Sequence, residues 1–403
     1  MTTNTEQLQP IKAVLDEVLA QVREQYSDEL AKAVHAGLGV IASLSLQRRD
    51  HCLVMIYEGG PGAGKSTAVR LLSPERPETR LVAERIDSFT AASFVSHAAN
   101  RSPEELDKID LLPRIKGKVM LTKELSQLFS NEEKALRVSF GTLTSVLDGN
   151  GLRTNSGSQG ERGYEGDYRF NWIGATTPIP ARTHDLMAQL GNRILFYELP
   201  SRESSEDELL DLLGTSSVGT NVDLLREKVN DQIEEHFKQQ PVNSVDPATI
   251  AFPEALKRML VRYAKLIVHG RVAVSRSADG ELETTEREGG ERVAFLLNTL
   301  CLGLALINGR DHVTKGDLQV IKHVALSSLP QKRRNLLQRV LAAGGRLTST
   351  AFATSANISK PTALERMKEL AATGICSLKG GNQQASTPAA VSLTDGWKWL
   401  LPT

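Results

Sequence analysis

The sequence has few cysteines and no long apolar segment. Its three cysteines are far apart, and apart from the adjacent His51 and Cys52 no His or Cys lies within four residues of another. Neither a disulfide framework nor a zinc site is predicted. The longest apolar stretch, residues 293–307, is interrupted by polar residues and is shorter than the ~20 residues of a membrane span. The N-terminus also lacks a basic region followed by an apolar run, so we expect a cytoplasmic location and no membrane partner.

The chain also lacks net charge, because 48 basic residues balance 48 acidic ones. Their distribution is uneven: residues 331–403 contain ten Lys or Arg and three Asp or Glu. This pattern predicts a basic C-terminal module and suggests DNA as a partner. A chain of 403 residues is too long for one ordinary core, so several compact units are expected.

The order of apolar patterns divides the chain into four parts. Residues 1–50 have the three- and four-residue spacing of amphipathic helices. Residues 51–200 alternate short apolar runs with helical stretches, which predicts an α/β core with a parallel sheet. Helices are expected to dominate residues 201–330, and the basic module occupies 331–403. A glycine-rich segment after residue 147 predicts a projecting β-hairpin, and residues 275–291 are expected to form a solvated linker.

The segment GGPGAGKST, residues 59–67, fits the phosphate-binding pattern G-x-x-x-x-G-K-[ST]. It follows an apolar strand and precedes a helical stretch, as this motif requires. Its glycines let backbone N–H groups surround the phosphates, Lys65 reaches the β- and γ-phosphates, and Ser66 binds magnesium. The sequence thus predicts an ATP and Mg²⁺ site formed by Gly59, Gly60, Pro61, Gly62, Ala63, Gly64, Lys65, Ser66 and Thr67.

Three later segments indicate a family. FNWIGATTPIP, residues 170–180, resembles the sensor-1 strand of AAA+ ATPases, and LGNRILFYELP, residues 190–200, resembles their arginine-finger segment. Residues 289–321 resemble the lid helices of minichromosome-maintenance-type and phage or mobile-element AAA+ proteins. The resemblance covers residues 52 to about 330 and implies a P-loop core, a helical lid at 201–330 and a homo-oligomer, either ring or filament.

The resemblance also implies three catalytic roles. Thr176, with Thr177 as its neighbour, would hold the attacking water or the γ-phosphate. Arg193 would be the finger presented to a neighbouring subunit, and Arg292 would be sensor 2. Guanidinium groups stabilise the charge that spreads over the γ-phosphoryl oxygens, and a hydroxyl at a strand tip orients the nucleophile.

The sequence lacks the usual acidic pair where the family carries Asp followed by Glu. The segment KVMLTKEL has Lys123 and Glu124 instead. If Lys123 occupies the aspartate position, Glu124 is the glutamate that polarises water. If the register differs by one residue, Glu124 is the magnesium-linked acid and no catalytic glutamate remains. Slow, assembly-dependent hydrolysis and binding without hydrolysis are both open.

The basic module resembles a winged helix. In residues 348–375 two helical segments are separated by a turn at 357–359, and the second helix would point Lys360, Thr362 and Arg366 outward. A wing around Lys379, Gly380 and Gly381 would contact the DNA backbone or minor groove. Winged helices also dock proteins or serve a structural role, and both alternatives remain open.

Three functions fit these patterns. The first is an oligomeric AAA+ ATPase that couples ATP binding and hydrolysis to DNA binding or remodelling. The second is an ATP-switched DNA-binding initiator or regulator with little or no hydrolysis, which Lys123 favours. The third is a remodelling ATPase that uses the C-terminal module to dock protein partners.

Overall fold

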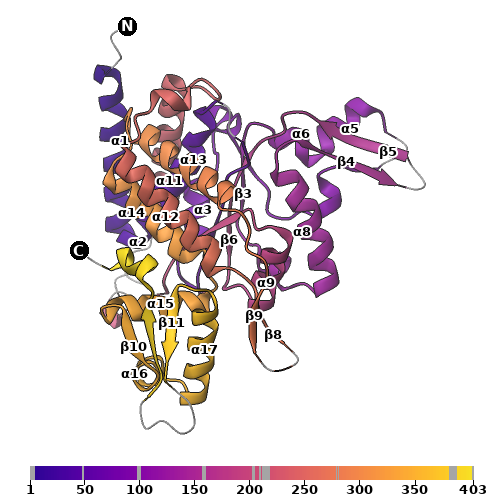
Figure 1. Ribbon diagram of the computed structural model, residues 1–403. Helices are drawn as coiled ribbons and strands as arrows, with labels where there is room; N and C mark the ends of the chain where they lie inside the picture. Colours follow the sequence, from indigo (N-terminus) through magenta and orange to yellow (C-terminus); the bar gives the residue numbers. More distant parts are fainter. Residues whose placement is uncertain are drawn as a thin grey trace.

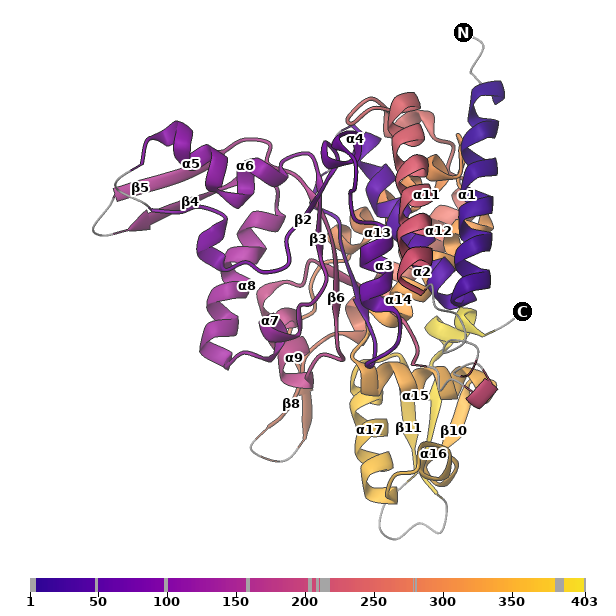
Figure 2. The same ribbon diagram turned by 180° about the vertical axis from the view of Figure 1, so that it is seen from behind.

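A five-stranded parallel sheet forms the centre of the protein (Figures 1 and 2). The computed structural model describes residues 5–47, 50–97, 101–156, 160–201, 205–207, 210, 218–277, 279, 281–380 and 388–401. The strand order is β2-β3-β6-β1-β7. The strands are β1 (Val54–Glu58), β2 (Ala83–Arg85), β3 (Val119–Thr122), β6 (Asn171–Thr176) and β7 (Ile194–Glu198). The predicted parallel α/β sheet is confirmed.

Every residue of β1, β3 and β6 is buried, because helices cover both faces of the sheet. One face packs against α2 (Asp28–Ala42), α3 (Lys65–Leu71), α13 (Glu291–Ile307) and α14 (Lys315–Ser327). The other packs against α6 (Leu111–Ile115), α7 (Ser126–Ser130), α8 (Glu133–Leu147) and α9 (Ala181–Leu190). Around these lie α1 (Thr5–Gln25), α4 (Pro77–Arg80), α5 (Pro103–Ile109), α11 (Val218–Gln239) and α12 (Glu254–Gly270).

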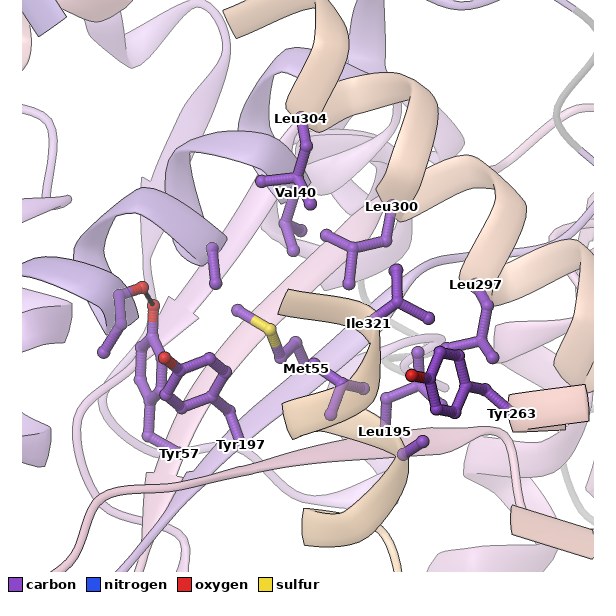
Figure 3. Packing of buried hydrophobic residues seen from close by; sticks show 14 of the residues in the cluster. Val40, Met55, Tyr57, Leu195, Tyr197, Tyr263, Leu297, Leu300, Leu304 and Ile321 are labelled. Carbon is purple, nitrogen blue, oxygen red and sulfur yellow. Dashed lines mark hydrogen bonds between the residues drawn. The ribbon is translucent and has the colours of Figure 1, made fainter. Parts of the chain in front are cut away.

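Alternate residues of β1 enter two separate cores, as the period of a strand requires. Val54 and Ile56 belong to the cluster under α8 and α9, whereas Met55 and Tyr57 belong to the larger cluster under α2 and α13. Figure 3 shows Met55 among residues of this larger cluster. Tyr57 Oη donates a hydrogen bond to the Ala33 carbonyl oxygen of α2 at 2.7 Å. The larger cluster includes residues from all four predicted segments, so the boundaries at 50, 200 and 330 stay predictions.

The predicted glycine-rich hairpin is present as β4 (Gly151–Ser156) and β5 (Gly160–Glu165), which project from the sheet (Figure 1). Its arginines are paired with acids of the same chain. Arg153 contacts Glu165 at 2.5 Å, and Arg162 contacts the fully buried carboxylate of Asp110 at 2.7 Å. Each of these two arginines therefore has an acidic partner within the chain.

The prediction of a solvated linker at residues 275–291 is wrong for the first half of that segment. Val274–Arg276 and Leu282–Thr284 form an antiparallel hairpin, β8–β9, that lies beside α17 (Lys360–Ala372) in Figure 1. Arg276 contacts Glu365 of that helix. A two-stranded hairpin by itself has only marginal stability. The polar sequence of β8 and β9 does not indicate that α17 packs against them.

The last part of the chain forms a small unit of three helices and three strands. The elements follow the order α15 (Gln331–Ala342), β10 (Arg346–Thr348), α16 (Ser349–Ala356), α17, β11 (Cys376–Lys379) and β12 (Ala390–Leu393). The sheet is antiparallel with the order β10-β12-β11. Within the described ranges, no helix is both long and apolar enough to span a membrane.

Candidate nucleotide site

The predicted phosphate loop connects β1 to α3 at the carboxyl edge of the sheet. Gly62 and Gly64 have φ angles of 76° and 83°, a conformation that glycine adopts without the steric cost of a Cβ. Lys65 begins α3, and its Nζ donates to the Gly60 carbonyl oxygen at 2.6 Å. The loop therefore curls around the lysine side chain.

Lys65 and Glu124 lie at the same edge of the sheet. Lys65 begins the helix after β1, and Glu124 is the second residue after β3. Both strands run parallel to β6, so their carboxyl ends meet at one edge. Burial lowers the pKa of Lys65, and the negative charge of Glu124 acts in the opposite direction.

Glu124 is also linked to the end of β6 through Ser126. Glu124 Oε1 accepts hydrogen bonds from the Ser126 backbone N–H at 2.8 Å and from its hydroxyl. Ser126 Oγ lies 2.8 Å from Thr177 Oγ1 and accepts from the Thr177 N–H at 3.1 Å. The predicted residue Thr176 is buried, and its hydroxyl has no partner among the described residues. Of the two threonines, Thr177 is the one connected to the acid.

Sequence reasoning missed Ser126. The signal available was a hydroxyl two positions after the acid and directly before a helical turn, where Ser commonly bonds to nearby backbone groups. Its contact with Thr177 joins residues 51 positions apart, so only the pairing of β3 with β6 brings them together.

The position at which β3 ends is relevant to the choice between the two registers of Lys123 and Glu124. The strand consists of the four buried residues Val119 to Thr122, and Lys123 and Glu124 follow it directly. Burial and the charge of Arg85 lower the pKa of Lys123, while Asp87 raises it. Lys123 therefore lies among charges of β2 and the residues after it.

The side chains at this edge fit a magnesium ion that is bound together with a nucleotide. Mg²⁺ is usually held by one or two protein oxygens, with phosphates and waters completing its shell. Ser66 and Glu124 are both exposed and supply a hydroxyl and a carboxylate. No group of three or more His, Cys, Asp or Glu in the described part of the chain would hold a metal without a nucleotide.

Arg193 lies at the opposite edge of the sheet. It precedes Ile194, which pairs with Val54 at the start of β1. The predicted phosphate loop follows the other end of β1, about 15 Å away. Arg193 Nε and Nη2 donate to the two carboxylate oxygens of Asp148 at 2.8 and 3.0 Å, and its side chain is 10% exposed. Arg193 therefore lies too far from the predicted phosphate loop of its own chain to contact a nucleotide bound there.

Arg292 lies beside Arg193. A Cβ built on Gly191 would be 3.3 Å from a terminal nitrogen of Arg193 and 3.4 Å from one of Arg292. Arg292 Nε is buried without a hydrogen-bond partner among the described residues. The structure thus brings the two arginines together and separates both from Lys65, Glu124 and Thr176.

The predicted DNA-contact residues lie on α17 and β11. Lys360, Thr362 and Lys379 are exposed, and Arg366 is half-buried. The Thr362 hydroxyl lies 2.8 Å from Ser359 Oγ, which also caps α17. Gly381, predicted for the wing, falls outside the described residues.

Two arginines of the basic module point inward. Arg334 is 1% exposed and contacts Glu58 at 3.0 Å and Glu198 at 2.8 Å. Arg333 is 6% exposed and donates to the carbonyl oxygens of Gly270 and Val272. Both contribute to the positive charge counted for residues 331–403, yet their contacts hold the C-terminal unit on the rest of the protein.

The sequence matches no family model and no curated protein. Among solved structures, that of a "putative ATPase" from Cytophaga hutchinsonii is similar, with a TM-score of 0.37 and 15% sequence identity. The similarity covers 80% of this chain and 89% of that one. A similarity this weak carries no argument about function, so the assignment of the site rests on the residues of this chain.

Proposed function

We propose that the protein is an oligomeric AAA+ ATPase that binds ATP and Mg²⁺ at residues 59–67 and couples nucleotide turnover to DNA binding or remodelling. One observation carries the proposal: the loop with the complete phosphate-binding pattern lies at the same sheet edge as Glu124. Phosphoryl transfer requires mainly positioning and charge stabilisation. A lysine, an exposed acid and a strand-end hydroxyl at one edge supply the groups for both.

In this proposal each residue at the edge has one task. Lys65 binds the β- and γ-phosphates, Ser66 contributes to magnesium binding, and Glu124 accepts a proton from the attacking water. Thr177 orients the water or the γ-phosphate through the same Ser126 hydroxyl that holds Glu124. The four-residue length of β3 supports Lys123 at the aspartate position and Glu124 at the glutamate position.

The order of elements from α15 to β12 supports a winged helix, with α17 as the recognition helix. The exposed side chains of Lys360, Thr362 and Lys379 are of the types that contact phosphates and base edges. The acid Glu365 on α17 contacts Arg276 of β8 and Lys368 of its own helix, which reduces its repulsion of phosphates.

A second candidate is an ATP-switched DNA-binding initiator or regulator with little or no hydrolysis. Lys123 favours it, because a cation replaces the acid that would contribute to magnesium binding. Nucleotide would then control assembly on DNA while turnover stays negligible.

ATP turnover separates the two candidates. It would be measured for the full chain and for Glu124→Gln, each with and without single- and double-stranded DNA. We expect turnover that DNA stimulates and that Glu124→Gln lowers about 100-fold or more, as loss of a general base does. Tight ATP binding without turnover would support the switch, and no ATP binding would contradict both candidates.

A further inference from the structure

Arg334 of α15 reaches the carboxyl edge of the central sheet. Its Nη1 donates to Glu58 Oε2 at 3.0 Å and to the Ser327 carbonyl oxygen at 2.9 Å, and its Nη2 donates to Glu198 Oε1 at 2.8 Å. Glu58 and Glu198 end β1 and β7 and are paired with each other across these strands. One guanidinium therefore bonds to two neighbouring carboxylates, one of which is 1% exposed.

The same strand ends support the phosphate loop. Gly59 follows Glu58 and is the first residue of the loop, and a Cβ on Gly59 would lie 2.3 Å from the Leu199 carbonyl oxygen. The Leu199 N–H donates to the Glu58 carbonyl oxygen at 2.8 Å. The start of the loop therefore has little room to move relative to the end of β7. A displacement of the backbone at either strand end would therefore act on the loop.

Glu58 also contacts the segment that follows β6. Its Oε1 accepts a hydrogen bond from the Ile179 N–H at 3.0 Å, two residues after Thr177. Arg334 and Ile179 therefore bond to different oxygens of the same carboxylate. The orientation of this carboxylate links α15 to both the phosphate loop and the segment after Thr177.

If the C-terminal unit moved away, Arg334 would leave with it, because α15 packs against α17 within that unit. The buried carboxylate of Glu58 would then lose its counter-ion beside a second acid. Removing one partner of a buried ion pair is costly, because the remaining charge stays away from water. We call the unit seated when Arg334 contacts Glu58 and Glu198. The free energy of the seated position therefore depends on the geometry at the start of the loop.

We infer that Arg334 is a positioning residue that couples the seating of the C-terminal unit, residues 331–401, to nucleotide binding at residues 59–67. The inference rests on the proposed nucleotide site. Because linkage is reciprocal, nucleotide stabilises the seated unit, and the seated unit raises nucleotide affinity. A DNA-contacting module would thereby respond to the occupancy of the loop without touching the nucleotide.

Arg333 provides a matched control. It is the preceding residue of the same helix, is similarly buried, and also bonds to groups outside the C-terminal unit. Its Nη1 donates to the Gly270 and Val272 carbonyl oxygens at 3.1 and 2.5 Å, at and just after the end of α12, and not to either carboxylate at the sheet edge. Arg333→Met therefore removes a similarly buried arginine contact of the unit, while the contacts of Arg334 with Glu58 and Glu198 still hold the unit seated.

The test compares full-length wild type, Arg334→Met and Arg333→Met. Affinity for a non-hydrolysable ATP analogue in the presence of Mg²⁺ would be measured by calorimetry. Amide hydrogen exchange of residues 331–342 would be measured with and without that analogue. We expect Arg334→Met to weaken affinity about tenfold and to abolish nucleotide-dependent protection. Arg333→Met should keep an affinity near wild type and retain that protection. Equal effects of the two substitutions would overturn the coupling.

Two further variants keep the test decisive if Arg334→Met does not fold. Arg334→Lys can bond well to one carboxylate at a time, and Glu198→Gln removes one charge but keeps a hydrogen-bond acceptor. Each is expected to weaken affinity by about threefold and to reduce the protection. Wild-type affinity and protection in both would overturn the inference. Absence of analogue binding by the wild type would overturn the proposed site itself, and the coupling with it.

Discussion

Ser126 Oγ lies 2.8 Å from Thr177 Oγ1 and also donates a hydrogen bond to Glu124 Oε1. One hydroxyl thus joins the acid that follows β3 to the threonine that follows β6. The hydroxyl of the neighbouring Thr176 is buried and has no hydrogen-bond partner among the described residues. This arrangement fixes the direction of the acid more closely than an exposed glutamate would achieve by itself.

Ser126→Ala is expected to lower kcat about tenfold, with a smaller effect on KM, because the acid loses the group that orients it. Thr177→Val should act in the same direction, and Thr176→Val should have less effect. Ser130→Ala is the control, since Ser130 lies on the same helix and its hydroxyl donates to the Ser126 carbonyl oxygen, away from Glu124 and Thr177. Steady-state ATPase kinetics give both constants, and an unchanged kcat for Ser126→Ala would exclude the positioning role.

Lys65→Ala is expected to abolish ATP binding, because it removes the cation that faces the phosphates. Calorimetry with ATP and Mg²⁺ measures the loss. Lys108→Ala, which changes an exposed lysine on α5, serves as the control and should bind as the wild type does. Equal ATP affinity of Lys65→Ala and the wild type would rule out this loop as the binding site.

Lys123→Asp is expected to raise Mg²⁺-dependent turnover about tenfold if Lys123 occupies the aspartate position. In that register the new carboxylate would supply a further oxygen ligand for magnesium and would remove a positive charge. Lys123→Ala removes the cation without adding an oxygen and separates the two effects. Turnover would be measured at a series of Mg²⁺ concentrations. Equal turnover of Lys123→Asp and Lys123→Ala would argue for the other register.

Arg193→Ala is expected to leave ATP affinity unchanged and to lower turnover of the assembled protein about a thousandfold, as loss of an arginine finger does. Arg169→Ala is the matched control: Arg169 precedes β6 at the same edge and is held by Asp167 at 2.7 and 2.6 Å. Mixing Arg193→Ala with Glu124→Gln subunits should restore part of the turnover. No restoration would argue against a site shared between subunits.

His236 should make the protein less stable in acid. Burial lowers the pKa of His236 to about 4, from an ordinary value of 6.5, so the folded state favours the neutral ring. Its contribution to stability is fully present above pH 6.5 and is lost as the pH falls toward 4. The loss would be about 1.4 kcal/mol per pH unit, or about 3 kcal/mol at pH 4.

Chemical denaturation at pH 7, 5 and 4 checks this contribution. His236→Asn should be less stable than the wild type at pH 7, and the difference should shrink as the pH falls. His312→Asn, at an exposed position, is the control. A difference between wild type and His236→Asn that does not change with pH would contradict the prediction.

Local patterns predicted the parallel sheet and several of the elements around it. The apolar runs around β1, β3 and β6, the projecting hairpin and the buried helix α13 all follow from the period and composition of short segments. The β8–β9 hairpin was missed because its stability depends on α17, about 80 residues later in the chain. The short strands of polar residues there give no periodic signal.

The sequence by itself determined the phosphate loop, because its glycines and its lysine act through backbone conformation and spacing within nine residues. Only the tertiary structure decided which charges meet. Arg334 contacts Glu58 across 276 positions, and Arg193 contacts Asp148 across 45, so no local pattern distinguishes an inward arginine from an exposed one. The direction of a long charged side chain depends on the partner that folding brings within hydrogen-bond distance, and that partner lies elsewhere in the chain.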